Sequence, residues 1–263
     1  MTCESIYQNM KKILGIFAFV AFALNAFPQG KTWTRVIDIG VIGQFRSTWL
    51  INKNISDAAG HEDYAATFGG GAGLRIQYFG GGPLGGGIEL GYGTINQKYK
   101  GVNTSSYNIP DYESTNHLKC FDIPVFLKLG SSEGGYFEAG CQFSFITGAT
   151  NETNLNHPPD TDPYYTGDVS DKFKSKFIAP FIGFGGSFNL IQEQVLLTVG
   201  LRFAYGVSDV VGIDGWGQDL TEGSATYTSV IRKAYKISYD NYQPTHPLYG
   251  GLMLGIIYSI PVS

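Results

Sequence analysis

Charged side chains recur at alternate positions within short, otherwise apolar segments of this 263-residue chain. Four are acidic and four are basic, so each of these charges has a possible partner of opposite sign, as buried charges require. Two interpretations fit the pattern: a structural salt-bridge network that fills a lumen, or a path that conducts ions or relays protons. We expect the structural network and no open pore. The residues are Asp38, Arg46, Arg75, Glu89, Asp122, Lys128, Glu138 and Arg202.

Histidines are the other candidates for catalysis. A nucleophile and its base must lie within hydrogen-bond reach of each other. All four histidines fall in expected loops or at strand edges, and none belongs to a His/Ser/acid pattern on one strand face. We therefore expect no catalytic residues, no cofactor and no enzyme activity, with a membrane-embedded lipid-modifying enzyme as the weakest alternative. The histidines are His61, His117, His157 and His246.

One expected loop, about 150–174, is acidic. Spaced carboxylates can hold Ca²⁺, but the spacing and central glycine of an EF-hand are missing. We expect a solvated acidic loop and no metal site, although Ca²⁺ binding stays open. The carboxylates are Asp160, Asp162, Asp168 and Asp171.

Another expected loop, about 209–244, is rich in aromatic residues. Exposed aromatic side chains can anchor a protein partner. They can equally pack the loop on itself or lie on lipopolysaccharide. The candidate partner contacts are Trp216, Tyr227, Tyr235 and Tyr239.

The elements that position these residues are strands. From about residue 36 to 260, apolar residues occupy every second position of eight segments, a period typical of strands with two different faces. The connectors alternate between long and short, as in an outer-membrane barrel. We predict an all-β fold, an eight-stranded antiparallel up-and-down transmembrane β-barrel. The long connectors are about 50–64, 99–116, 150–174 and 209–244, and the short ones are 79–83, 130–135 and 189–194.

The apolar face of each strand should meet lipid, because the opposite face carries charges that a bilayer would not solvate. A soluble lipocalin-like barrel would reverse the two faces. Aromatic residues fall near both ends of the strands, as the two interfacial belts of a membrane barrel require. The formal net charge of −4 offers no basic surface for nucleic acid.

The N-terminus reads as a targeting segment. Two lysines precede an apolar stretch at 13–24, followed by a plausible cleavage site near residue 26. We expect a signal peptide at 1–26, with 1–9 as a possible upstream extension, and a barrel domain at 27–263. Export together with strands indicates the bacterial outer membrane, and an even number of strands places both termini in the periplasm.

Two cysteines lie in the expected barrel. Pairing of the two strands about the turn at 130–135 places Cys120 opposite about residue 145, roughly four residues from Cys141. At ~3.3 Å per residue the offset is about 13 Å, too far for a disulfide. We expect two free thiols.

Several strands resemble the PorT-like outer-membrane β-barrel family of Bacteroidota. The segment FDIPVFLK at 121–128 carries most of the resemblance, and GIELGYGTI at 87–95, YFEAG at 136–140 and LRFAYG at 201–206 are similar to other strands of the family. The resemblance implies an eight-stranded barrel of the OmpA or OmpX kind. It transfers no task, because most members have none assigned, and the 209–244 connector is longer than is usual in the family.

The expected function is that of a non-enzymatic integral outer-membrane protein with a structural or interaction role, such as a subunit of an export or assembly complex. A narrow porin-like transport protein is the alternative. Expected partners are outer-membrane lipid and lipopolysaccharide, the barrel-assembly machinery during biogenesis, and a protein bound through the long loops. The hydrophobic–aromatic segment 256–260 resembles a C-terminal assembly signal.

Overall fold

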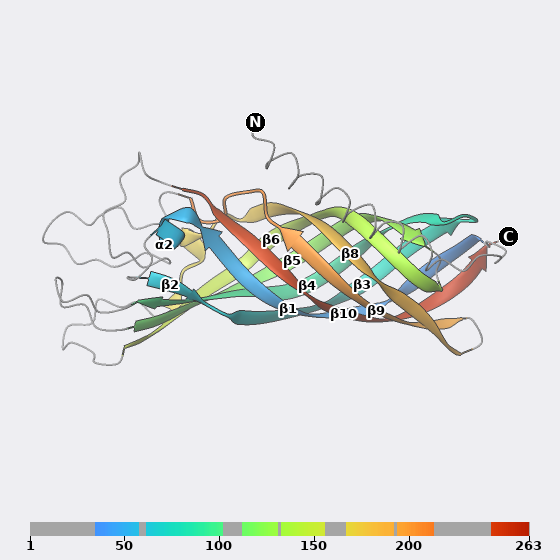
Figure 1. The fold of residues 1–263 in the computed structure, drawn as a ribbon, viewed down its shortest axis with the longest axis horizontal. Helices are drawn as coiled ribbons and strands as arrows, with labels where there is room; N and C mark the ends of the chain where they lie inside the picture. Colours follow the sequence, from blue (N-terminus) through green and yellow to red (C-terminus); the bar gives the residue numbers. More distant parts are fainter. Residues whose placement is uncertain are drawn as a thin grey trace, which may run out of the picture.

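A computed structural model describes residues 35–57, 62–101, 112–130, 133–155, 167–191, 194–212 and 243–262. Eight long antiparallel strands form a closed, tilted ring (Figure 1), which confirms the predicted barrel. No helix among the described residues is both long enough and apolar enough to cross a membrane. The expected signal peptide at 1–26 lies outside the described residues.

The ring strands are joined by alternating short turns and long connections, and two minor strands lie at the long-loop end. The ring consists of β1 (Arg35–Asn52), β3 (Thr67–Gly80), β4 (Leu84–Gly101), β5 (Tyr112–Gly130), β6 (Gly134–Leu155), β8 (Lys176–Ile191), β9 (Val195–Tyr205) and β10 (Thr245–Val262). The additional elements are α2 (Lys53–Asp57), β2 (Glu62–Ala65), β7 (Gly167–Asp168) and the 3₁₀ turn η1 (Ser170–Lys172).

The first and last strands pair with each other and close the ring. Arg35 lies opposite Val262, and the register continues without a break to Asn52 and Thr245. The pairing of β4 with β5 joins the remaining neighbours. In Figure 1 the start of β1 and the end of β10 lie at the same end of the barrel as the short turns. Gly81 (φ 84°) and Gly134 (φ 100°) supply the left-handed backbone at two of these turns.

The strands run further toward the long-loop end than the sequence pattern predicts. β4 continues to Gly101 and β5 begins at Tyr112, so the described residues at both ends of the expected connector 99–116 are strand. Likewise β6 extends to Leu155 and β1 to Asn52. The prediction was wrong here because the outer face becomes polar beyond the lipid band, at Lys98 and Glu113 for example, while the ladder continues.

The two faces of the wall have the predicted composition. Outward apolar side chains are exposed around the whole ring, up to 63% for Leu127, whereas inward charged side chains are buried. Cys120 and Cys141 are both free thiols, and Cys120 is buried. The register of β5 and β6 shifts between Lys119 and Cys120, which places Cys120 opposite Ile146.

Candidate functional site

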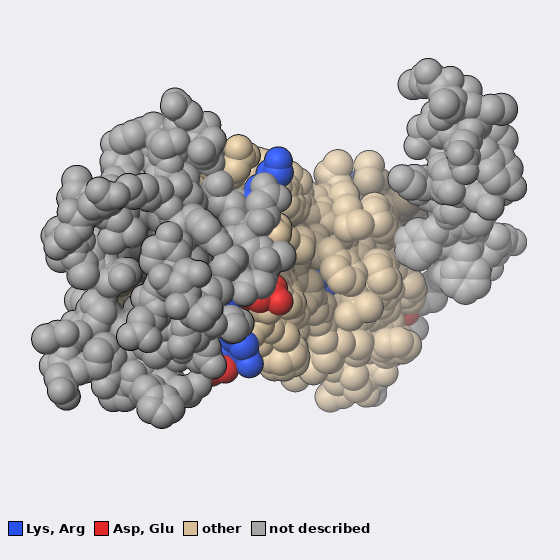
Figure 2. Space-filling view, turned by 60° about the vertical axis from the view of Figure 1, so that its left-hand side comes forward, with Lys and Arg blue, Asp and Glu red and all other residues tan. Residues whose placement is uncertain are grey.

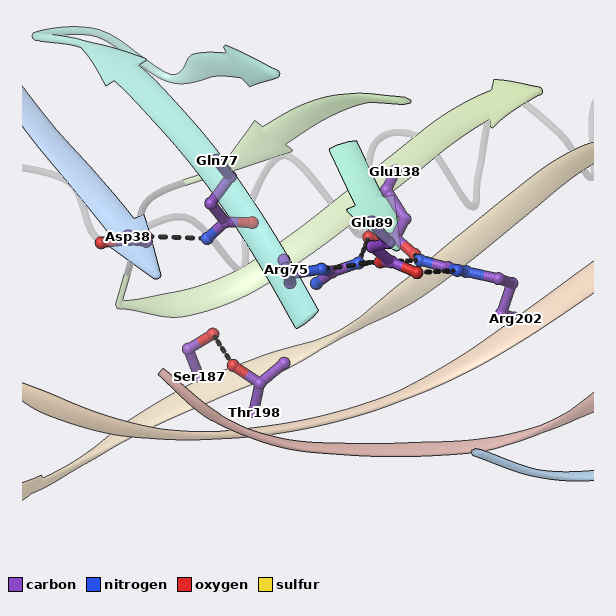
Figure 3. Close-up of polar contacts among 8 residues, drawn as sticks. All are labelled: Asp38, Arg75, Gln77, Glu89, Glu138, Ser187, Thr198 and Arg202. Atoms are coloured by element: carbon purple, nitrogen blue, oxygen red, sulfur yellow. Dashed lines mark hydrogen bonds and ion pairs between the residues drawn. The ribbon is translucent and has the colours of Figure 1, made fainter. Parts of the chain in front are cut away.

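The centre of the lumen holds a cluster of four charged side chains, one from each of four strands (Figure 3). Arg75 on β3 lies opposite Glu89 on β4, while Glu138 comes from β6 and Arg202 from β9. Each occupies an inward position of its strand, because side chains alternate between the two faces. All four are at most 3% exposed. We call these four residues the central cluster.

Each carboxylate of the central cluster bridges both arginines. Arg75 donates from Nε to Glu89 Oε1 at 2.7 Å and from Nη2 to Glu138 Oε2 at 2.8 Å. Arg202 donates from Nε and Nη2 to Glu138 Oε1 at 2.9 and 2.6 Å. It also donates from Nη1 and Nη2 to Glu89 Oε2 and Oε1, each at 2.8 Å. The two positive and two negative charges balance, and the planar forks of arginine hold the carboxylates in a fixed arrangement.

Aromatic rings and a glycine complete the packing around the central cluster. The Arg75 guanidinium lies 4.6 Å from the Phe126 ring centroid, and that of Arg202 lies 4.4 Å from the Phe181 centroid. Such contacts add a favourable cation–π interaction. A Cβ atom at Gly183 would come within 2.8 Å of Glu138 Cγ and Oε1, so this position has room only for glycine. The cross-section is therefore filled by protein atoms at this level.

A second polar group lies toward the long-loop side. Arg46 Nη2 is 3.5 Å from Asp122 Oδ2, and its guanidinium lies 4.5 Å from the ring centroid of Tyr249. Asp122 Oδ1 accepts a hydrogen bond of 2.7 Å from Ser144. A cavity of about 20 Å³ borders Arg46, Asp122 and Glu89. That volume is enough for about one water molecule, and it is far from a continuous channel.

A third polar group lies toward the short turns and is less well satisfied. Gln77 donates to Asp38 Oδ2 at 2.7 Å. Lys128 Nζ lies 4.0 Å from the ring centroid of Tyr136 and 5.7 Å from that of Phe79. Lys128 Nζ, Asp38 Oδ1, Gln77 Oε1 and Tyr136 Oη are buried without a hydrogen-bond partner among the described residues. Lys128 is thus held by aromatic faces and by longer-range charge.

The outer half of the lumen is closed by an apolar cluster that the sequence reasoning missed. Inward side chains such as Leu50, Ile95 and Leu118 pack with residues from the connecting segments, and all of them are buried. The connecting segments contribute Val169 and Phe173 on either side of η1, and also Val210 and Val211. A usable signal was present, because Leu50, Ile95 and Leu118 share the inward parity of the charged positions.

All eight charges assigned to the lumen point inward and are buried. The structure brings together the four of the central cluster, pairs Arg46 with Asp122, and places Asp38 and Lys128 in the third group. The loop residues assigned as partner contacts lie outside the described residues: Trp216, Tyr227, Tyr235 and Tyr239.

The described residues on either side of the long connection 213–242 are held by one carboxylate, that of Asp209. Its two oxygens accept hydrogen bonds from the backbone N–H groups of Val211 (3.2 Å), Gly212 (3.1 Å) and Thr245 (3.0 Å). The Lys174 ammonium donates to Asp209 Oδ2 at 3.2 Å. Val210 also donates its N–H to the Thr245 carbonyl at 3.0 Å. Asp209 therefore fixes the spacing of the two stems of this connection.

The remaining candidate residues have structural contacts in the described part of the chain. The ring Nδ1 of His117 lies 3.0 Å from Asn96 Oδ1, and that of His246 lies 2.9 Å from the Gly206 carbonyl. Neither contact resembles a nucleophile–base pair. His61 and His157 lie outside the described residues.

Two of the four loop carboxylates, Asp160 and Asp162, also lie outside the described residues. The hydroxyl and backbone N–H of Ser170 donate to Asp168 and lower the pKa of its carboxyl below the ordinary value. Asp171 pairs with Lys172. Within the described ranges no cluster of three or more His, Cys, Asp or Glu is placed to hold a metal ion.

Comparison with known proteins gives one family match. The model of a family described as outer membrane protein beta-barrel domain matches residues 27–212. No curated protein matches the chain.

Three solved structures illustrate the structural similarity. Neisserial surface protein A has 13% identity and a TM-score of 0.38, over 84% of this chain and 96% of its own. OprG from Pseudomonas aeruginosa has 13% identity and a TM-score of 0.37, over 89% and 99% of the respective chains. The outer membrane protein AlkL, solved in lipid bilayers, has 15% identity and a TM-score of 0.42, over 90% and 95%. None of these similarities assigns a role to this chain.

Proposed function

Because this chain belongs to the outer membrane protein beta-barrel domain family, we propose that it is a non-enzymatic protein of the bacterial outer membrane with a sealed barrel. In this proposal the barrel anchors the chain in the membrane. The long loops perform its task by binding a partner. The lumen itself carries no solute.

The filling of the lumen is the observation that supports a sealed barrel. The central cluster occupies the middle of the lumen with four buried side chains joined by six hydrogen bonds of 2.6–2.9 Å. The apolar cluster closes the outer half. An ion that crossed this barrel would have to break paired buried charges and then pass through dry apolar packing, and both steps are costly.

Planar-bilayer recording tests the sealed barrel directly. The purified full chain, inserted at known orientation, should give no steady single-channel steps, while a porin inserted in the same membranes gives clear ones. A variant with Arg75→Ser and Glu138→Ser removes one positive and one negative side chain from the plug and keeps the charge balanced. We expect this variant to conduct transiently. Steady steps from the wild type would support the narrow porin-like alternative and refute the sealed barrel.

The interaction role is supported by the way the longest connection is anchored. Asp209 accepts hydrogen bonds from residues on both sides of the 213–242 segment, so the chain enters and leaves that segment at a fixed spacing. The candidate contacts Trp216, Tyr227, Tyr235 and Tyr239 belong to this segment. Its partner, in our proposal, is another subunit of an export or assembly complex. The resemblance of residues 121–128 to the PorT-like family motivates that choice of partner.

Cross-linking in native membranes tests the interaction role. A photoreactive residue at Trp216 or Tyr235 should give a discrete adduct of defined mass. The same probe at Tyr258, on the lipid-facing wall, should give none. If neither loop position gives an adduct different from that of Tyr258, the interaction role fails while the sealed barrel stands.

Orientation and lack of catalysis complete the proposal. The described ends, Arg35 and Val262, lie opposite each other beside the short turns. In bacterial barrels the short turns are periplasmic, and so we place both termini there. Protease added to intact cells should therefore cleave only the long connections.

Lipid A and peptide hydrolysis assays should be negative for the wild type, and turnover of either substrate would contradict a non-enzymatic role.

A further inference from the structure

The outer surface of the barrel carries an aromatic row where the lipid band ends. The row consists of Tyr92 on β4, Phe121 on β5 and Phe145 on β6. Phe121 lies directly opposite Tyr92 on one neighbouring strand and opposite Phe145 on the other, so the three side chains lie side by side. They are 50%, 38% and 42% exposed. Aromatic side chains favour the boundary between acyl chains and headgroups. In Figure 2 the charged side chains gather near the loops, and the tan wall beyond them shows few.

Two lysines stand at this row without a carboxylate partner. Lys119 lies two residues beyond Phe121 toward the loops, and Lys176 on β8 is the register partner of Phe145. Both are exposed. Among the described residues, no carboxylate oxygen lies within 4.0 Å of either ammonium.

Other lysines near the loop end of the barrel lie beside carboxylates. The ammonium groups of Lys98 and Lys100 lie 3.0 Å from the oxygens of Glu113. Lys172 and Lys174 lie 2.9 and 3.2 Å from aspartate oxygens. Within the described part of the chain, Lys119 and Lys176 are therefore two exposed lysines on this side of the barrel that have no carboxylate partner, whereas Lys98 and Lys100 share the one carboxylate of Glu113.

Hydroxyl groups lie beside Lys119. Thr147 Oγ1 donates to the Lys119 carbonyl at 3.2 Å and is 3.4 Å from the Tyr92 hydroxyl. Lys176 lies two strands away from Lys119 and is level with Phe121, so the two lysines are also offset by two residues along the strand direction. With strands ~4.8 Å apart and ~3.3 Å per residue, their Cα atoms are about 12 Å apart. We call Tyr92, Lys119, Thr147 and Lys176 the headgroup patch.

We propose that the headgroup patch binds the phosphate groups of a phosphorylated glycolipid of the outer leaflet. The ammonium groups of Lys119 and Lys176 pair with phosphate oxygens, and the hydroxyls of Tyr92 and Thr147 hydrogen-bond to phosphate or sugar. The aromatic row identifies the ligand as a membrane lipid, because acyl chains attached to such a headgroup would lie against Phe121 and Phe145. A free phosphate in solution would gain nothing from that row.

Lipid titration of the full chain tests this site. The protein in discs of neutral lipid is titrated with diphosphoryl lipid A, with the same lipid after enzymatic dephosphorylation, and with inorganic pyrophosphate. The test variant carries Lys119→Gln and Lys176→Gln. The control carries Lys100→Gln and Lys172→Gln, which removes the same net charge outside the headgroup patch. Heat-modifiable migration on a gel verifies that both variants are folded.

We expect the wild type and the control to bind diphosphoryl lipid A alike, and the test variant to bind about 25-fold more weakly, since each interfacial lysine contributes about fivefold. The dephosphorylated lipid should not distinguish the three proteins. Equal binding of phosphorylated and dephosphorylated lipid, or an equal loss in the control, would overturn the proposal. Pyrophosphate binding as tight as lipid binding would overturn the assignment to a membrane lipid. These outcomes leave the sealed barrel untouched, because conductance tests it separately.

Discussion

Substitution of Arg202 by methionine should destabilise the barrel mainly through charge. Arg202 makes four of the six hydrogen bonds of the central cluster, and it is 3% exposed. Methionine keeps much of the apolar volume but leaves Glu89 and Glu138 to share Arg75 alone. Loss of one partner from a buried ion pair costs about 3–5 kcal/mol. We expect a loss of that size in the free energy of unfolding.

A compensating variant separates charge from packing. Arg202→Met combined with Glu138→Gln removes one charge of each sign, and the Arg75–Glu89 pair, with its 2.7 Å hydrogen bond, stays intact. This double variant should recover most of the lost stability, because a balanced buried cluster can be replaced at little cost. Its free energy of unfolding should lie within about 1–2 kcal/mol of the wild-type value. The surface change Lys176→Gln should stay within ~0.5 kcal/mol of the wild type.

These differences can be measured by urea unfolding in lipid vesicles, with the shift in gel migration as the signal for unfolding. If the dependence of the unfolding free energy on urea concentration is the same for all variants, the shift in the urea midpoint gives the change in stability. If the double variant were as unstable as Arg202→Met, charge balance would not be what the central cluster contributes. The cost would then belong to the lost hydrogen bonds and to packing against Phe181.

Three further changes give distinct outcomes. Lys128→Met should cost less than about 3 kcal/mol in the same unfolding assay, the lower limit expected for Arg202→Met, because Lys128 Nζ makes no hydrogen bond within the described protein and only its longer-range charge is lost. Gly183→Ala should cost about 1–3 kcal/mol, because its Cβ would press on Glu138, whereas Gly148→Ala, which meets nothing within 4 Å, should be neutral in that assay. Asp209→Ala should speed hydrogen exchange at the Thr245 amide by roughly 5- to 150-fold, because the lost hydrogen bonding corresponds to ~1–3 kcal/mol. Exchange at central barrel amides should stay unchanged, and mass spectrometry can resolve the two regions. Equal exchange at Thr245 in the variant and the wild type would refute the anchoring role of Asp209.

The faces of the wall could be predicted from the sequence because strand parity is a local property. Glu89 and Glu138 each lie among apolar neighbours of opposite parity, so their inward direction follows from two or three adjacent residues. Their partners could not be predicted in the same way. Arg202 is 113 positions from Glu89, and their contact depends on the register of all the strands between them.

The length of the strands and the closing of the mouth were harder to predict for physical reasons. Lipid imposes an apolar outer face over only part of each strand, so the alternation fades at Lys98 although the ladder continues. The apolar outer lumen is assembled from several strands and from segments near η1. The inward parity of Leu50 and Leu118 is readable from the sequence, but it does not show that residues from distant connecting segments pack against them and close the lumen.

The central cluster also bears on the order in which the barrel assembles. A partly formed sheet that contains β3 to β6 but lacks β9 carries Arg75, Glu89 and Glu138, which leaves an excess negative charge on its inner face. Lipid cannot solvate that charge, and only the arrival of β9 with Arg202 neutralises it. The open sheet is therefore penalised within the bilayer, so closure of the ring and insertion must proceed together.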